Sequence, residues 1–186
     1  PVPSVQVEKT AEKDLGRTRR VLFVGRLVER KGVEYLVRAM KELDLPFPVE
    51  LDVVGAGPEE ENLRNLVQQL DLAGRVNLAG RVSNVELKEY YASCDCFVLP
   101  AIIDSRGDTE GLGVVLIEAL SYHKPVVASA LGGIVDIIHH EKTGLAVPEK
   151  DPKALAAAIS RLLTDQDLAR RLAEDGFEFV QRYFDW

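Results

Sequence analysis

Two carboxylates, Glu110 and Glu118, stand eight residues apart around the expected start of a helix. Residues 108–120 read DTEGLGVVLIEAL, an acidic, glycine-containing turn that runs directly into an apolar helical pattern. We expect a helix over residues 112–121, and the free N–H groups and positive dipole end at its start favour a phosphate. Glu118 interrupts the apolar run, and a buried carboxylate requires a polar partner. A diphosphate at the helix start, with a hydroxyl-rich group near each acid, corresponds to a sugar nucleotide.

A cationic pair, Arg26 and Lys31, follows the apolar run VLFVG and precedes Gly32. Arg26 offers a planar fork of donors and Lys31 a mobile point charge, and both types of side chain bind phosphate oxygens. Cations at the start of a helix are disfavoured by its dipole, so this pair indicates an anionic ligand. Two solvated basic residues at a helix start are the alternative interpretation.

Six short apolar segments that alternate with helical patterns supply the framework for these side chains. We expect strands at residues 21–25, 49–55, 75–80, 95–100, 125–129 and 144–148. Ser83, followed three residues later by Glu86, is a typical N-cap for a helix that ends at Ser93. The alternation predicts an α/β fold, an open, doubly wound, Rossmann-like parallel sheet of about six strands with helices on both faces. Ligands of such sheets bind at the carboxyl ends of the strands, where most of the glycines gather.

Further loops at this edge contain candidate contact residues. Gly55 and Gly57 form a glycine turn after the second strand, and Arg81 and Val82 follow the third strand. The dinucleotide fingerprint G-x-G-x-x-G is absent, because Glu60 occupies the position of its third glycine. A G-x-x-x-x-G-K-[ST] phosphate loop is absent as well. These loops therefore do not predict a dinucleotide site.

Composition is that of a globular protein, with 46% hydrophobic and 28% charged residues in a chain of 186. A net charge of −7 argues against nucleic acid as a partner, because phosphate backbones are bound by an excess of Lys and Arg. No run approaches the ~18 apolar residues of a membrane span, and no secretory signal is visible, so we expect a cytoplasmic location. Cys94 and Cys96 lack the partners of a zinc site and are expected to be small buried side chains.

The domain organisation is simple. Residues 1–20 mix Pro, Lys, Glu and Arg without periodicity and are interpreted as a linker or lead-in. Residues 21–186 form the expected domain. Because the chain begins with Pro1 and stops abruptly at Trp186, we interpret it as an excised part of a longer protein.

Four motifs together resemble the retaining glycosyltransferases of family 4, which have the GT-B fold, and the resemblance runs over residues 21–186. The run Glu110-Gly111-Leu112-Gly113, followed by Glu118, matches their E-G-[FL]-G motif and its second Glu in full. Residues 25–32 match their G-R-[LF]-x-x-x-K-G loop, residues 55–58 their G-x-G-P turn, and residues 81–82 the end of their F-x-G-x-V segment. A G-G-x-x-E turn is also similar, but Asp136 replaces its Glu, so Asp136 is not assigned to the site.

The resemblance implies the C-terminal, donor-binding half of a GT-B enzyme, without its N-terminal acceptor domain. The enzyme would transfer a sugar from a nucleoside diphosphate to a hydroxyl of a glycan or lipid acceptor. It implies catalytic roles for Glu110, Arg26 and Lys31, and no required metal or other cofactor. The donor-binding residues that it implies are Gly25, Arg26, Lys31, Gly55, Gly57, Arg81, Val82, Gly111, Leu112, Gly113, Val114 and Glu118.

Other functions stay open. A sugar-nucleotide epimerase has a similar architecture, and a regulatory module that only binds a nucleotide sugar would carry the same motifs. A dinucleotide oxidoreductase is disfavoured because its fingerprint is absent. The sequence does not identify the base, the sugar, the acceptor or the oligomeric state, and it leaves open peripheral contact of the full-length protein with a membrane.

Overall fold

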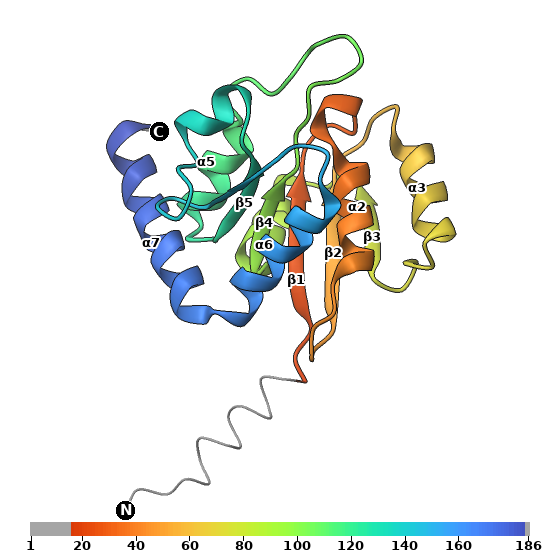
Figure 1. The fold of residues 1–186 in the computed structure, drawn as a ribbon, viewed down its shortest axis with the longest axis horizontal. Helices are drawn as coiled ribbons and strands as arrows, with labels where there is room; N and C mark the ends of the chain where they lie inside the picture. Colours follow the sequence, from red (N-terminus) through yellow and green to blue (C-terminus); the bar gives the residue numbers. More distant parts are fainter. Residues whose placement is uncertain (1–15, 185–186) are drawn as a thin grey trace, which may run out of the picture.

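Six parallel strands form one sheet in the computed structural model, which describes residues 16–184 (Figure 1). In spatial order they are β3-β2-β1-β4-β5-β6, and every neighbouring pair is parallel. Their bounds are β1 (Arg19–Val24), β2 (Val49–Val54), β3 (Val76–Gly80), β4 (Cys96–Leu99), β5 (Val126–Ser129) and β6 (Leu145–Val147). This order is that of the doubly wound nucleotide-binding sheet, and the predicted fold class is confirmed.

Helices connect the strands. They are η1 (Glu29–Lys31), α2 (Val33–Glu42), α3 (Glu60–Gln69), α4 (Asn84–Ser93), α5 (Val114–Ser121), η2 (Gly132–Asp136), α6 (Pro152–Thr164) and α7 (Gln166–Tyr183), where η denotes a 3-10 helix. The chain passes along the sheet from β1 through β2 to β3, and then in the opposite direction from β3 to β4 and β5. Because crossover connections are right-handed, α2 and α3 lie on one face of the sheet and α4 and α5 on the other. Helix α6 packs beside α2, and α7 packs beside α5 (Figure 1).

The strands are almost wholly apolar because both faces of the sheet are covered. Val21, Leu22 and Phe23 of β1 are at most 1% exposed, and the four residues of β4 are fully buried. Burial of apolar surface contributes roughly 25 cal/mol per Å² to stability. The strand ends are therefore held rigidly, and the loops that leave them start from fixed positions.

Two predicted boundaries need correction. Strand β1 begins at Arg19, inside the region interpreted as a linker, because the Arg19 N–H bonds the Pro48 carbonyl at 2.8 Å and its guanidinium lies over the Phe47 ring. Helix α5 begins at Val114 and not at residue 112. The predictions for residues 1–15 and 185–186 lie outside the described residues.

The predicted capping box at the start of α4 is confirmed. The Ser83 hydroxyl accepts a hydrogen bond from the Glu86 N–H at 3.3 Å, and the Glu86 carboxylate accepts one from the Ser83 N–H at 2.8 Å. The bond from the Ser83 N–H and a second one from the Ser83 hydroxyl to the same carboxylate, at 2.7 Å, lower the pKa of Glu86. The box satisfies N–H groups that the first turn of a helix leaves free, and so fixes where α4 starts.

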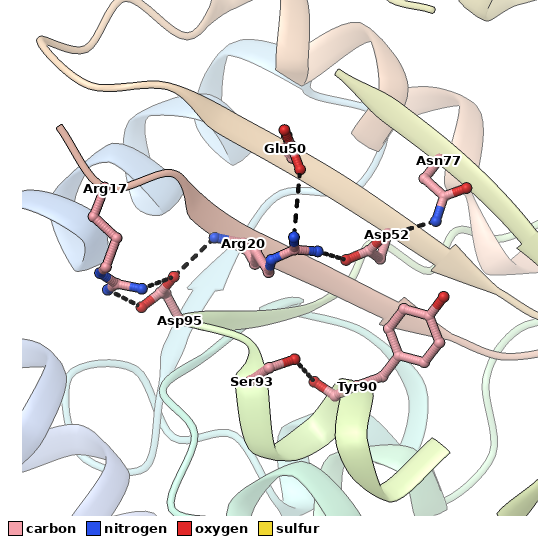
Figure 2. A network of polar contacts seen from close by, with 8 residues as sticks. All are labelled: Arg17, Arg20, Glu50, Asp52, Asn77, Tyr90, Ser93 and Asp95. Carbon is pink, nitrogen blue, oxygen red and sulfur yellow. Dashed lines mark hydrogen bonds and ion pairs between the residues drawn. The ribbon is translucent and has the colours of Figure 1, made fainter. Parts of the chain in front are cut away.

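A polar network ties the amino-terminal half of β1 to its neighbours (Figure 2). The Asp52 carboxylate on β2 is buried and accepts hydrogen bonds from Asn77 at 2.9 Å and from the Arg20 guanidinium at 3.3 Å. Asp95 accepts from the Arg20 N–H at 2.8 Å and pairs with Arg17. This network satisfies the buried charge. It lies toward the end of the sheet opposite to the carboxyl edge where the predicted site residues gather.

Candidate functional site at the carboxyl edge of the sheet

The predicted site residues lie on loops that leave the carboxyl ends of neighbouring strands. The long loop between β4 and α5 rises above this edge, in green at the top of Figure 1. Backbone hydrogen bonds from Gly25 N to Val54 O, at 3.0 Å, and from Gly55 N to Gly80 O, at 2.8 Å, join the ends of β1, β2 and β3. The loops are therefore assembled in the order of the strands along one edge.

The structure brings Lys31 and Glu110 together as an ion pair, although 79 residues separate them. Lys31 ends η1 in the loop after β1, and Glu110 belongs to the loop after β4. Both side chains are only 12% exposed. The Lys31 chain passes Gly25, where an added Cβ would lie 3.8 Å from the Lys31 Cε. The two residues that were predicted to bind diphosphate and sugar therefore face one another.

The loop that carries Glu110 is fixed on one side by the glycine pair Gly132-Gly133. A Cβ on Gly132 would lie 2.4 Å from the Glu110 carbonyl oxygen, and one on Gly133 would lie 2.1 Å from that of Gly111. Such distances are far too short for real contacts, so the close approach of the two loops requires glycine. Sequence comparison suggested this turn as a motif, and the structure gives it a packing role.

On its other side the same loop is held by acidic side chains. The Glu29 carboxylate of η1 accepts hydrogen bonds from the Ser105 N–H at 3.0 Å and from the Ser105 hydroxyl at 2.7 Å. Glu149 accepts from the Ile103 N–H at 2.7 Å. The Glu29 contacts join the loop to the η1 segment that carries Lys31, and Glu149 holds the loop from the segment after β6.

Helix α5 starts beside this pair without a side-chain cap. Its N-cap is Gly113, whose φ of 67° lies in the left-handed region that glycine adopts without strain. Leu112 is therefore the residue before the cap. Its N–H group belongs to the turn, whereas the expected helix start at residue 112 would have placed it in the helix. Leu112 and Val114 are 45% and 41% exposed. The start of α5 thus offers uncapped N–H groups and the positive end of a dipole to a ligand.

Glu118 lies on the solvent side of α5, contrary to the burial that its apolar neighbours suggested. The residues beside it, Ile117 and Ala119, face the core and are at most 2% exposed, whereas Glu118 is exposed. Its carboxylate accepts a hydrogen bond from the Tyr91 hydroxyl at 2.7 Å. Tyr91 comes from α4, and sequence reasoning did not single it out. The only indication in the sequence was Glu118 itself, because a carboxylate within an apolar run requires a hydrogen-bond donor as its partner.

Gly55 and Gly57 are explained by packing between loops. A Cβ on Gly55 would lie 1.8 Å from the Gly25 carbonyl oxygen, and one on Gly57 would lie 2.3 Å from that of Leu27. The loops after β1 and β2 therefore touch through their backbones, further joined by a hydrogen bond from Leu27 N to Ala56 O at 3.0 Å. Contact of these glycines with a nucleotide stays a prediction.

Arg26, Arg81 and Val82 are distributed along the same edge. Arg26 is exposed in the loop after β1, next to the segment that carries Lys31. Arg81 is exposed and Val82 half-buried after β3, the outermost strand on that side of the sheet. Within residues 16–184, no hydrogen bond or ion pair joins these three residues to the Lys31–Glu110 pair. Their contact with a ligand stays a prediction.

Other features of the molecule lie away from this edge. A pocket with a volume of about 410 Å³ lies against α7 and includes Lys142, Arg171 and Phe179 in its lining. Cys94 and Cys96 are free and buried, as predicted, and burial raises the pKa of the Cys94 thiol to about 12. Residues 16–184 contain no cluster of three His, Cys, Asp or Glu side chains suited to a metal ion. Within that range, no helix is both long and apolar enough to cross a membrane.

Comparison with known proteins gives a consistent result. The family model described as "Glycosyl transferases group 1" matches residues 6–179. The chain is 35% identical over 188 residues to a GDP-mannose-dependent alpha-(1-6)-phosphatidylinositol monomannoside mannosyltransferase of Mycobacterium tuberculosis, and the match covers 100% of this chain and 49% of that protein. The chain thus spans about half the length of the curated relatives that it matches.

Solved structures agree in fold. Sucrose-phosphate synthase from Thermosynechococcus elongatus superposes with a TM-score of 0.80 at 34% identity, over 99% of this chain and 45% of that one. The Anabaena protein HepE, in complex with UDP-glucose, superposes with a TM-score of 0.81 at 23% identity, over 100% of this chain and 50% of its own. The sheet and its helices thus correspond to the C-terminal domain of the GT-B fold.

Proposed function

The chain belongs to the group 1 glycosyltransferase family, and on that premise we propose that it is the donor-binding domain of a retaining glycosyltransferase. The reaction transfers a sugar from a nucleoside diphosphate to an acceptor hydroxyl. The observation that carries the proposal is the Lys31–Glu110 pair beside the uncapped start of α5. A cation, free N–H groups and a carboxylate there meet the needs of a diphosphate joined to a sugar.

Each group has a role in the proposed mechanism. Lys31 and Arg26 neutralise the negative charge that grows on the leaving diphosphate, together with the N–H groups at the start of α5. Glu110 faces the transferred sugar and favours the positive charge that develops on its ring as the glycosidic bond breaks. Glu118 accepts hydrogen bonds from the ribose hydroxyls. The mechanism requires no metal ion, because protein cations balance the diphosphate charge.

A ligand that follows the loops has one orientation. The diphosphate lies at the start of α5, and the sugar lies towards Glu110. Glu118 turns towards α4, as its bond with Tyr91 shows, so we place the ribose on the α4 side of α5. The base then lies towards the loop after β3, which contains Arg81 and Val82, with Gly55 and Gly57 shaping the loops between.

The donor is a nucleoside diphosphate sugar whose base and sugar stay open. The mycobacterial relative is named for GDP-mannose, whereas the Anabaena structure contains UDP-glucose. We infer that the acceptor, a glycan or a lipid, binds to the part of such enzymes that this chain does not cover. A cytoplasmic location, with peripheral contact between the full-length protein and a membrane, belongs to the same proposal.

The test separates the two acids. Glu118→Gln should weaken binding of nucleoside diphosphate and sugar nucleotide alike in calorimetric titrations of this domain. Glu110→Gln should not weaken diphosphate binding, but it should lower kcat in the full-length enzyme. Loss of diphosphate binding in Glu110→Gln and not in Glu118→Gln would show that the ligand is oriented in reverse. Epimerisation of the sugar nucleotide without transfer would contradict the proposed reaction.

A further inference from the structure

Tyr91 is a buried hydroxyl aimed at a residue of the candidate site. The residue is 2% exposed, and its hydroxyl donates to the Glu118 carboxylate at 2.7 Å. Glu118 itself is exposed, so water could satisfy its carboxylate without help from the protein. The bond is therefore not needed to compensate a buried charge on Glu118. Its effect is to hold one oxygen of that carboxylate in a fixed place.

The Tyr91 ring is held between two other aromatic rings. Phe97 of β4 stacks with it at a centroid distance of 5.8 Å, and Tyr122, just after α5, stacks at 5.2 Å with an interplanar angle of 14°. Such contacts from two sides leave the ring little freedom, so the direction of its hydroxyl is set by the core. Burial and the neighbouring Glu118 raise the pKa of the Tyr91 hydroxyl, which keeps it a donor at every pH at which the protein is handled.

We propose that Tyr91 is a positioning residue, which orients the Glu118 carboxylate to accept hydrogen bonds from the ribose of the nucleotide. An ionised carboxylate has two oxygens and about four lone-pair sites. Tyr91 occupies a site on one oxygen and leaves the other oxygen free for the two ribose hydroxyls. A long, exposed glutamate that is already oriented loses less side-chain entropy when the ligand binds. This inference rests on the proposed function, because it requires Glu118 to meet the ribose.

The experiment compares nucleoside diphosphates with their 2′,3′-dideoxy counterparts. UDP, GDP and ADP are titrated calorimetrically into the wild-type domain, and the tightest is then tested in both forms with Tyr91→Phe. We expect Tyr91→Phe to weaken binding of the ribose form by about 3- to 10-fold, the size of one lost hydrogen bond. Binding of the dideoxy form should not change, because that ligand offers Glu118 no hydroxyl. Tm should fall by no more than about 4 °C.

Two further variants complete the design. Tyr90→Phe removes a hydroxyl from the neighbouring position of α4 and should match the wild type. In a Glu118→Ala background, Tyr91→Phe should have no further effect on the ribose form. Equal weakening of both ligand forms, or equal weakening with and without Glu118, would show that Tyr91 acts only through folding. Wild-type-like binding of both forms by Tyr91→Phe overturns this inference alone, whereas absence of nucleoside diphosphate binding by the wild type overturns the proposed function and this inference with it.

Discussion

Lys31 and Glu110 neutralise one another in the ligand-free protein, and this contact changes the expected behaviour of each. In the proposed mechanism, a diphosphate that binds beside α5 takes Lys31 over from Glu110. Both side chains are only 12% exposed, so the exchange is favourable because one anion replaces another beside the largely buried cation. The exchange makes Glu110 a competitor of the diphosphate while it remains a partner of the sugar.

The first prediction follows from that competition. Glu110→Gln should strengthen the binding of a bare nucleoside diphosphate by at least about 2-fold, because Lys31 no longer has to leave a carboxylate. Calorimetric titration measures the change. The matched control is Glu149→Gln, because Glu149 contacts the loop that carries Glu110 but does not contact Lys31. Weaker diphosphate binding in Glu110→Gln would show that Glu110 supports the phosphate and does not compete with it.

Sequence reasoning could mark candidate site residues but could not predict their contacts. Lys31, Glu110 and Glu118 were marked by type and spacing, and the structure places all three at or near one sheet edge. The pairing of Lys31 with Glu110 joins positions 79 residues apart and depends on which strands are neighbours. Tyr91 was missed because a tyrosine in an amphipathic helix has no local signature, and only the packing of α4 against α5 reveals its partner.

At the scale of elements, the edge depends on loops that touch through their backbones. The glycines after β1 and β2 were expected to serve ligand contact, and the structure shows that Gly55 and Gly57 serve contact between loops. Such contacts cannot be inferred from spacing alone, because they depend on how far apart neighbouring strands end. The elements themselves were predictable, because apolar runs bounded by glycines mark buried parallel strands.

The second prediction tests this role of glycine. Gly55→Ala should lower the free energy of unfolding by at least about 2 kcal/mol, a large effect for one substitution. The added Cβ would lie 1.8 Å from the Gly25 carbonyl oxygen, and the φ of 137° is rarely adopted by alanine. Gly111→Ala is the matched control, because nothing lies within 4 Å of its added Cβ. Urea denaturation measures both, and similar losses for the two variants would contradict the packing role.

At the scale of the whole molecule, the buried titratable groups predict how stability depends on pH. Burial raises the pKa of Cys94 to about 12, and it also raises the pKa values of Cys96 and Tyr91. In the unfolded chain the thiols ionise near pH 8.5 and the phenol near pH 10. The native state therefore binds more protons than the unfolded state over this range, and stability must fall as pH rises.

The third prediction is the size and source of that fall. Between about pH 8.5 and 12, each buried group should reduce the free energy of unfolding by up to about 1.4 kcal/mol per pH unit, with full stability retained below pH 8. Urea unfolding at pH 7, 9 and 10.5 measures it. A Cys94→Ala, Cys96→Ala double variant should show a shallower decline. The same slope in both proteins would mean that other groups control the alkaline loss.

At the same scale, the candidate site lies along the carboxyl edge of the sheet and is formed by loops alone. The chain covers about half of its relatives, and the carboxyl edge of the sheet is where we propose that the remaining half meets the donor. The isolated domain should therefore bind a nucleoside diphosphate and transfer no sugar. Turnover by this domain alone with a simple acceptor would contradict that division of roles.

The most direct test of the account is whether the carboxyl edge holds a diphosphate through Lys31 and Arg26. Calorimetry compares a nucleoside diphosphate with its bare nucleoside in the wild type, Lys31→Ala, Arg26→Ala and the control Lys142→Ala, whose lysine lies in the pocket beside α7. Charge-assisted hydrogen bonds are worth about 1.5–3 kcal/mol, so each site variant should weaken diphosphate binding by roughly 10- to 150-fold and leave nucleoside binding unchanged. The control should behave like the wild type. Equal weakening of nucleoside and diphosphate, or unchanged diphosphate affinity in both site variants, would contradict the account.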